Sequence, residues 1–363
     1  MINYISDKIL KIKANKGDED AVNELMLRAL YQEKIGLKGI DDEELVYVTF
    51  IVNPQIEKLK ELYTQLILNK QAYQDNIVLD SFHSATIEGA RTTVDNVVNA
   101  MKDKPKTKDD QMVVNSINAY YYAFNNLNTI ENLLELWKIV TKDVCDNQDK
   151  VGSRFRTAMV YIGNETQTIH TPEVPEKIEK RMASLYNYLD KVINQSDEDN
   201  ALLAAIIYHF YFVYIHPFAD GNGRTARIMM ASIMHHAGYD KVGALPISRC
   251  INDRLSRYYN SLEESEEVKK GANSKYLDIT PFIAEMLDVL ELAMLSAIAS
   301  QNGLTKNESM LLIKMKKRKG AEITVEKCAS ILEITNSSAK NLLQGMVDKG
   351  YLIKIGNIYR SKV

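Results

Sequence analysis

Residues 216–227 read HPFADGNGRTAR, and this segment determines how the rest of the chain is interpreted. It follows an apolar run, Ala201 to Ile215, that is shorter than the roughly 20 residues of a membrane span and is typical of a buried core helix. Gly221 and Gly223 separate that run from a second helical pattern, which begins near Arg224. The segment therefore predicts a tight loop between two packed helices.

Helical periodicity continues on both sides of this loop. Apolar residues recur three and four positions apart in residues 22–32, 54–74, 93–101, 112–127, 130–145 and 177–193. Residues 157–171 break the pattern, because apolar positions there flank the turn-prone pair Gly163-Asn164, and we predict a short β-hairpin. The hairpin is either a plain surface connection or a functional element, and the pattern alone does not separate the two.

The C-terminal region has its own pattern and charge. Beyond Gln301-Asn302-Gly303 we expect helices at 306–319, 325–332 and 335–349 and a hairpin at 351–360, an order similar to a winged helix. Residues 304–363 contain twelve Lys or Arg and five Asp or Glu, a net charge of +7, so the other residues carry −10 of the total of −3. We predict a mainly α fold with an N-terminal helical region at 1–52, a helical domain at 53–300 and a winged-helix-like domain at 304–363.

Composition excludes few functions. The chain has 363 residues, of which 45% are hydrophobic, and three widely spaced cysteines without CxxC spacing, which argues against a disulfide framework or a zinc site. The first twenty residues lack a secretory signal pattern. We therefore expect a cytoplasmic protein that does not bind membranes.

The loop groups residues suited to phosphoryl or nucleotidyl transfer. Gly221 and Gly223 would let backbone N–H groups approach phosphate oxygens at the start of a helix, where the helix dipole favours anions. Arg224 and Arg227 lie three apart and so share a helix face for clamping phosphates. Asp220 can hold Mg²⁺ against the phosphates, and His216 can accept a proton from an attacking hydroxyl. Each residue alone also fits a plain turn, a cap or a solvated face, but the complete set favours a site.

This segment resembles the signature HxFx[D/E]GNGRxxR of the Fic family, and every specified position matches. The resemblance implies that His216 is the catalytic base, Phe218 anchors the loop, and Asp220 binds Mg²⁺. It also implies a target-docking role for the 157–171 hairpin. The residues that it assigns to ATP in this segment are Gly221, Asn222, Gly223, Arg224, Thr225, Ala226 and Arg227.

A second segment, residues 84–89, gains meaning from this resemblance. Its sequence SATIEG is similar to the inhibitory motif [S/T]xxxE[G/N] of class II members of the family, which implies inhibitory roles for Ser84, Glu88 and Gly89. A Glu88 carboxylate paired with Arg227 would occupy the donor that the ATP γ-phosphate needs. The alternative is an ordinary acidic residue at a helix end.

Tyr259 lies in a segment, 245–259, that is similar to the part of the family that closes over adenine and ribose. A nucleotide contact and core packing are both open for it. Trp137, the only tryptophan, is expected to be structural, and so are the histidines other than His216.

These features predict an enzyme that transfers AMP from ATP to a Ser, Thr or Tyr hydroxyl of a target protein and of itself, with inhibition by Glu88. By resemblance, removal of AMP is a further activity to consider, as is transfer of another phosphate-containing group. The alternative from another class is a DNA-binding regulator acting through residues 304–363, although the pattern slightly favours a protein-interaction or dimerisation module there. A homodimer is also left open.

Overall fold

The computed structural model describes residues 4–145, 151–163, 168–194, 198–267, 275–316 and 322–361. They divide into two compact units, one comprising Met1–Glu61 with Leu68–Leu290 and the other Leu62–Ile67 with Glu291–Val363. The division falls within two helices, one at 49–64 and one at 280–301, and the boundaries expected at 52 and 300 stay predictions. No helix in the described ranges combines the length and the apolar character needed to cross a bilayer.

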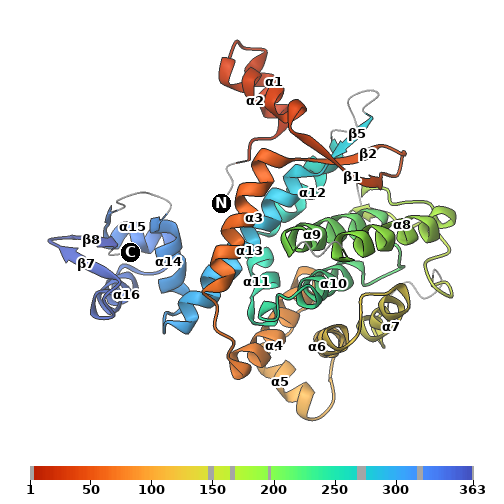
Figure 1. Cartoon of the computed structure of the whole chain (residues 1–363). Coiled ribbons are helices and arrows are strands. Elements are labelled where there is room, and N and C mark those ends of the chain that lie inside the picture. The colour runs from red at the N-terminus through yellow and green to blue at the C-terminus, as the bar shows by residue number, and fades with distance from the viewer. Residues whose placement is uncertain are drawn as a thin grey trace. The chain divides into compact units, whose positions relative to one another are not determined.

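Helices dominate the larger unit (Figure 1). They are α1 (Asp7–Ala14), α2 (Glu19–Leu30), α3 (Thr49–Thr64), α4 (Lys70–Ile87), α5 (Val94–Lys102), α6 (Lys108–Asn125), α7 (Ile130–Thr141), α8 (Pro175–Asn194), α9 (Glu198–Ile215), α10 (Asn222–His236), the 3₁₀ turn η2 (Val242–Ala244), α11 (Ile247–Asn252), α12 (Leu255–Glu267) and α13 (Thr280–Gln301), which continues into the smaller unit. The mainly α fold is therefore confirmed.

The core of the larger unit is formed by α9 and α10, which pack against each other. Every residue from Ala201 to Phe212 in α9 is buried, as expected for a helix that is apolar on all sides. On α10 the buried stretch runs from Arg224 to Met234 and includes two arginines. Helices α6, α7 and α4 also contact α10, so the two central helices are enclosed by other helices.

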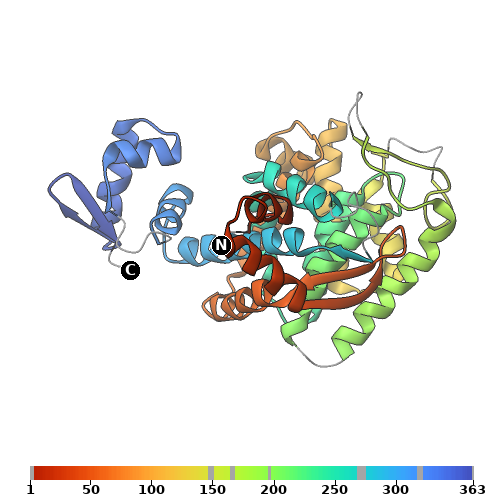
Figure 2. The same cartoon turned by 90° about the horizontal axis from the view of Figure 1, so that it is seen from above.

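The N-terminal region is only partly helical, so the description of residues 1–52 as helical is wrong for their second half. Strands β1 (Gln32–Lys38) and β2 (Glu44–Val48) pair antiparallel there, and β2 also pairs in parallel with β5 (Tyr276–Asp278). Figure 2 shows the long β1–β2 ribbon from above. Only the β2–β5 pairing joins residues more than 220 positions apart, so β5 has no local partner; β1 and β2 are neighbours in the chain and were not predicted either. The prediction of a single helix at 54–74 is also wrong. The chain forms α3 and α4 there, and Asn69 caps the start of α4.

The predicted hairpin at 157–171 contains two short antiparallel strands, β3 (Ile162–Gly163) and β4 (Thr168–His170). Its predicted turn residue Asn164 lies outside the described residues. The strands are confirmed, and their predicted docking role stays a prediction.

The smaller unit contains α14 (Lys306–Lys316), β6 (Glu322–Ile323), α15 (Val325–Leu332), α16 (Asn336–Asp348), β7 (Leu352–Ile355) and β8 (Ile358–Ser361). Its strands form an antiparallel sheet in the order β6-β8-β7, and Thr335 caps α16 by accepting a bond from the Ser338 N–H. Buried Leu311, Leu343 and Met346 form part of its core. The helices and the β7–β8 hairpin match the expected positions, although helix 306–319 extends beyond the described residues and β6 was not foreseen. The winged-helix assignment stays a prediction.

Candidate active site

The loop between α9 and α10 is held closed by its own side chains. Asn222 accepts a hydrogen bond from the Phe218 N–H at 3.0 Å and donates one to the Phe218 carbonyl at 2.8 Å. Phe218 is 1% exposed, and its ring stacks on Trp137 with centroids 4.6 Å apart. Phe218 thus anchors the loop in the core, and the two hydrogen bonds of the Asn222 side chain hold the loop closed.

Trp137 also fixes the residue expected to hold a metal. Its indole Nε1 donates to the Asp220 backbone carbonyl at 2.9 Å, which leaves the carboxylate on the loop surface with 25% of its side chain exposed. The Asp220 carboxylate accepts a bond from the Gly221 N–H at 2.5 Å. Trp137 is therefore structural, as expected, and it contributes directly to the shape of the loop.

His216 stands at the end of α9 in a left-handed backbone conformation, with φ of 54°. Its backbone carbonyl accepts a 2.8 Å bond from Nε of Arg156, a residue that is 2% exposed. Left-handed backbone is costly for a residue with a Cβ and is retained where the surroundings enforce it. The contact with Arg156 is one such constraint, and the sequence analysis did not identify it.

The imidazole of His216 has a defined tautomer. Nδ1 lies 3.2 Å from the Val213 carbonyl, which can only accept, so Nδ1 carries the proton and Nε2 keeps its lone pair. Burial lowers the pKa of His216 to about 4, against the opposing effect of that carbonyl. The side chain is therefore neutral at pH 7, with an accepting nitrogen, as a general base must be.

An anion cradle is formed where α10 begins. Gly221 caps the helix with φ of 77°, and a Cβ there would lie 2.8 Å from Cγ2 of Thr141. At Gly223 a Cβ would overlap a carboxylate oxygen of Glu88. Glycine is thus favoured at Gly221 by its left-handed backbone, whereas at Gly223 the absence of a Cβ leaves room for the Glu88 carboxylate beside the first turn of the helix.

Two buried arginines line this end of α10. Arg224 donates through Nη1 to the Val140 carbonyl at 2.9 Å, and its Nε has no partner among the described residues. A buried donor without a partner costs free energy and suits a site that receives an anion. Arg227 is 2% exposed, and its Nε and Nη2 bond to residues at the end of α4.

Residues 84–89 reach Arg227 from the end of α4. Nη2 of Arg227 donates to Glu88 at 2.6 Å and to the Ser84 carbonyl at 3.0 Å, while its Nε donates to the Ser84 hydroxyl at 2.8 Å. Gly89, with φ of 90°, follows the last helical turn and ends the helix at this point. The structure thus brings Ser84 and Glu88 to the same guanidinium.

Thr225 and Ala226 are two further positions of the segment 216–227. Both are 0% exposed. The Thr225 N–H bonds to the Gly221 carbonyl at 3.0 Å, within the helix. The Thr225 hydroxyl has no partner among the described residues, and the predicted contacts of both residues with ATP stay predictions.

Tyr259 is 47% exposed and lies edge-on to Tyr258, with ring centroids 5.3 Å apart. Tyr258 is buried, and its hydroxyl lies 3.0 Å from Nε2 of His209, whose pKa burial lowers to about 3. The positive charge of Arg227 acts to lower the pKa of all three side chains, Tyr259, Tyr258 and His209. His209 is a buried core residue, as expected, and its contact with Tyr258 was not predicted because neither residue has a distinctive pattern in its own segment.

The described residues contain no group of three His, Cys, Asp or Glu side chains arranged to hold a metal ion. Asp220 offers a single, partly exposed carboxylate at the cradle. Mg²⁺ commonly binds through one or two carboxylates together with substrate phosphates and water. The donor set therefore fits an ion that arrives with a nucleotide.

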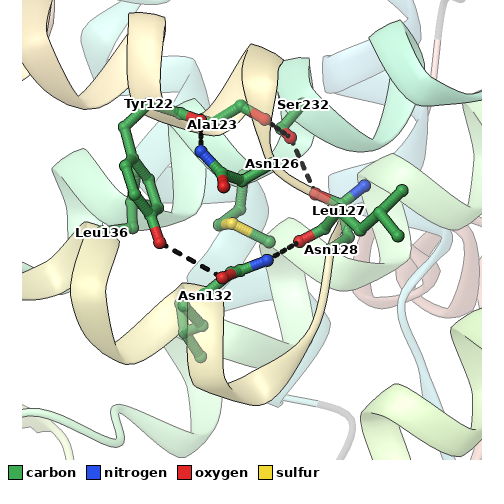
Figure 3. Close-up of a pocket in the computed structure, with 10 residues that line it drawn as sticks. Tyr122, Ala123, Asn126, Leu127, Asn128, Asn132, Leu136 and Ser232 are labelled. Carbon is green, nitrogen blue, oxygen red and sulfur yellow. Dashed lines mark hydrogen bonds between the residues drawn. The ribbon is translucent and has the colours of Figure 1, made fainter.

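A small pocket lies elsewhere, between α6, α7 and the middle of α10 (Figure 3). Its polar groups bond to one another: Ser232 donates to Asn128 at 2.7 Å, and the Tyr122 hydroxyl donates to Asn132 at 3.2 Å. The pocket shares no lining residue with the loop at 216–227. Its paired polar groups connect the three helices and offer little to a ligand.

Comparison with known proteins identifies the fold and the domain. Residues 127–234 match the Fic/DOC family. The chain is 28% identical over 234 residues to the protein adenylyltransferase Fic of Drosophila grimshawi, covering 61% of this chain and 42% of that one. It is 26% identical over 236 residues to the Nematostella vectensis protein of the same name, covering 63% and 47%. The chain thus spans less than half the length of these relatives.

Solved structures agree on the fold. A Fic family protein from Desulfovibrio desulfuricans superposes with a TM-score of 0.58 at 22% identity, over 85% of this chain and 96% of that one. A Fic-domain signaling protein from Bacteroides thetaiotaomicron superposes with a TM-score of 0.51 at 18% identity, over 69% and 98%. The chain therefore has the fold of these Fic proteins, and its residues 127–234 match the Fic/DOC family.

Proposed function

We propose that the chain is a protein adenylyltransferase, which transfers AMP from ATP to a Ser, Thr or Tyr hydroxyl of a target protein. The observation that carries the proposal is the arrangement of a neutral His216, with Nε2 free to accept, on the loop that begins the α10 cradle. The names of the relatives from Drosophila grimshawi and Nematostella vectensis support the same activity.

The proposed reaction uses the residues of this loop. The hydroxyl oxygen attacks the α-phosphorus, its proton passes to Nε2 of His216, and the bond to the β-phosphate oxygen breaks, so that pyrophosphate leaves. Arg224, Arg227 and the first N–H groups of α10 offset the charge on the phosphates. Asp220 would hold Mg²⁺, which neutralises phosphate charge when bound.

The hairpin at 157–171 is proposed to dock the target. Tyr161 is 66% exposed and Ile169 is 53% exposed, on either side of the β3–β4 pair. Exposed edge strands can bind an extended segment by adding a strand. Such a segment would bind through its backbone, whatever its side chains are, and would present its hydroxyl toward the loop at 216–227.

Inhibition by Glu88 is part of the proposal. A carboxylate on Arg227 and against Gly223 competes with an ATP phosphate for the same donors. If Glu88 instead orients a water molecule, the same site would remove AMP from a modified target.

Labelled ATP tests the activity. A Glu88→Gly variant is incubated with lysate and ATP labelled on either the α- or the γ-phosphate, and labelled proteins are analysed by mass spectrometry. Label from the α-phosphate with an added AMP mass supports adenylylation. Label only from the γ-phosphate would show phosphate transfer, and transfer that survives His216→Ala would refute the assigned base.

The smaller unit supports a second candidate function, binding of duplex DNA. The residues proposed to contact it are on the exposed face of α16, whereas Ala339, Leu343 and Met346 on the other face are buried. These exposed residues are Ser337, Ser338, Lys340, Asn341 and Gln344. Lys354 and Arg360 are the proposed wing contacts, of which Arg360 is paired with Glu322, and a protein partner stays the competing interpretation.

A further inference from the structure

Helix α4 carries polar side chains at a strict spacing of four residues. Asn76, Asp80, Ser84 and Glu88 occupy successive positions, so they lie along one face of the helix and its cap. Ser84 and Glu88 contact Arg227, as described above. The two earlier members bind a different part of the chain, and the proposed reaction does not use them.

Asp80 is the most completely bonded member of this stripe. Its Oδ1 accepts from the Ser248 N–H at 2.7 Å, and its Oδ2 accepts from the Ser248 hydroxyl at 2.7 Å and from the Tyr120 hydroxyl at 2.6 Å. Asp80 is 4% exposed and Ser248 is 0% exposed. A buried carboxylate with three short bonds fixes its helix both along and around the helix axis.

Asn76 extends the attachment by one turn. Its Nδ2 donates to the carbonyls of Gly243 and Leu245 at 3.0 and 2.9 Å. A Cβ at Gly243 would overlap the ring of Tyr73, which shows how closely α4 approaches this segment. Asn76 and Asp80 therefore bind α4 to residues 243–248. This segment precedes α12, the helix that carries Tyr258 and Tyr259.

We propose that Asp80 is a positioning residue, which holds α4 in the register that brings Glu88 to Arg227. The inference rests on the proposed adenylyl transfer and adds how that activity is controlled.

Helix geometry explains why position matters. A shift of one residue along a helix moves every side chain by about 1.5 Å and turns it by about 100°. Such a shift would break the 2.6 Å contact between Glu88 and Arg227. Glu88 itself is a weak anchor, because it stands at the helix end with 31% of its side chain exposed. The buried bonds of Asp80, two turns earlier, are better placed to set the register.

The test compares Asp80→Ala and Asp80→Asn with the parent in a transfer assay that uses α-labelled ATP, in chains with and without Glu88→Gly. Asp80→Ala should raise transfer by at least about fivefold, because bonds to a charged acceptor are lost. Asp80→Asn keeps an acceptor for the Ser248 N–H and should give a smaller gain. With Glu88→Gly already present, neither change should add to the rate.

Asp278 provides a matched control. It is also a buried carboxylate that accepts from the N–H and the hydroxyl of one residue, Thr280, but it lies outside α4. Asp278→Asn and Asp278→Ala should lower the melting temperature without raising transfer. Thermal unfolding of every variant shows which ones fold, and Asp80→Asn carries the test if the alanine variant does not.

Three outcomes would overturn the proposal. The first is a folded Asp80 variant with the transfer rate of the parent, the second is an equal gain in the Glu88→Gly background, and the third is an equal gain from the Asp278 variants. Failure of the proposed function gives a different result, namely no adenylyl transfer by Glu88→Gly alone.

Discussion

Replacement of Glu88 by glycine should raise AMP transfer, including self-modification, by more than about tenfold. The carboxylate of Glu88 bonds to Arg227 at 2.6 Å, and the side chain of Arg227 is 1% exposed. A hydrogen bond to a charged group contributes about 1.5–3 kcal/mol, and about 1.4 kcal/mol corresponds to a factor of ten. Partial exposure of the Glu88 carboxylate at 31% places the effect toward the lower end of that range. A tenfold gain is therefore the expected scale.

The assay follows label from α-labelled ATP into protein at a fixed ATP concentration. Ser84→Ala is the matched control, because it removes the hydroxyl that bonds to Nε of Arg227 but leaves the Glu88 pair in place, and it should give a much smaller gain. The double variant Glu88→Gly with Arg227→Ala should lose the gain, because the γ-phosphate of ATP then has no Arg227 guanidinium to bind. If Glu88→Gly transfers no faster than the parent while His216 is still required, the inhibitory assignment fails.

Other predictions concern the loop and the smaller unit. His216→Ala should abolish transfer but leave ATP affinity by calorimetry nearly unchanged, because the base acts on the attacking hydroxyl; residual transfer would contradict this role. Burial lowers the pKa of His216 from 6.5 to about 4. As the pH falls from 6.5 toward 4, the imidazole is therefore protonated in the unfolded chain before it is protonated in the folded one. The free energy of unfolding should fall over this range, and it should fall less in His216→Ala. Gly221→Ala should cost at least about 1 kcal/mol of stability in urea unfolding, since alanine is strained at φ of 77° and its Cβ would crowd Thr141. Binding of the full chain to duplex DNA, if it occurs, should weaken steeply between two salt concentrations, and absence of binding at low salt would leave a protein partner for the smaller unit.

The sequence predicted the loop at 216–227 well because its shape depends on contacts within a few residues. Asn222 bonds back to Phe218, and Gly221 caps the helix that follows. The apolar run ending at Ile215 likewise identifies a buried helix without any distant partner. Elements whose stability is encoded locally could be read from their own residues.

Elements that depend on distant partners could not be predicted in this way. Strand β2 is completed by β5, and its partners Val46 and Asp278 are far apart in the chain. Arg156 supports His216 from a separate loop, and Asp80 meets Ser248 only after folding. Each of these residues is an ordinary charged or polar residue in its own segment, so its role becomes visible only when its partner is known.

The cradle explains why one short segment can control this site. The N–H groups at the start of α10 and the guanidinium of Arg227 attract any compact anion, whether a phosphate or a carboxylate. Glu88 uses the space left by the missing side chain of Gly223, the same feature that would let a phosphate approach the backbone. Under the proposed function, Glu88 and the nucleotide would compete for the same donors, without a separate regulatory pocket. The strength of inhibition would then depend on how firmly α4 is held, so the buried contacts of Asp80 would contribute to control together with the Glu88 carboxylate.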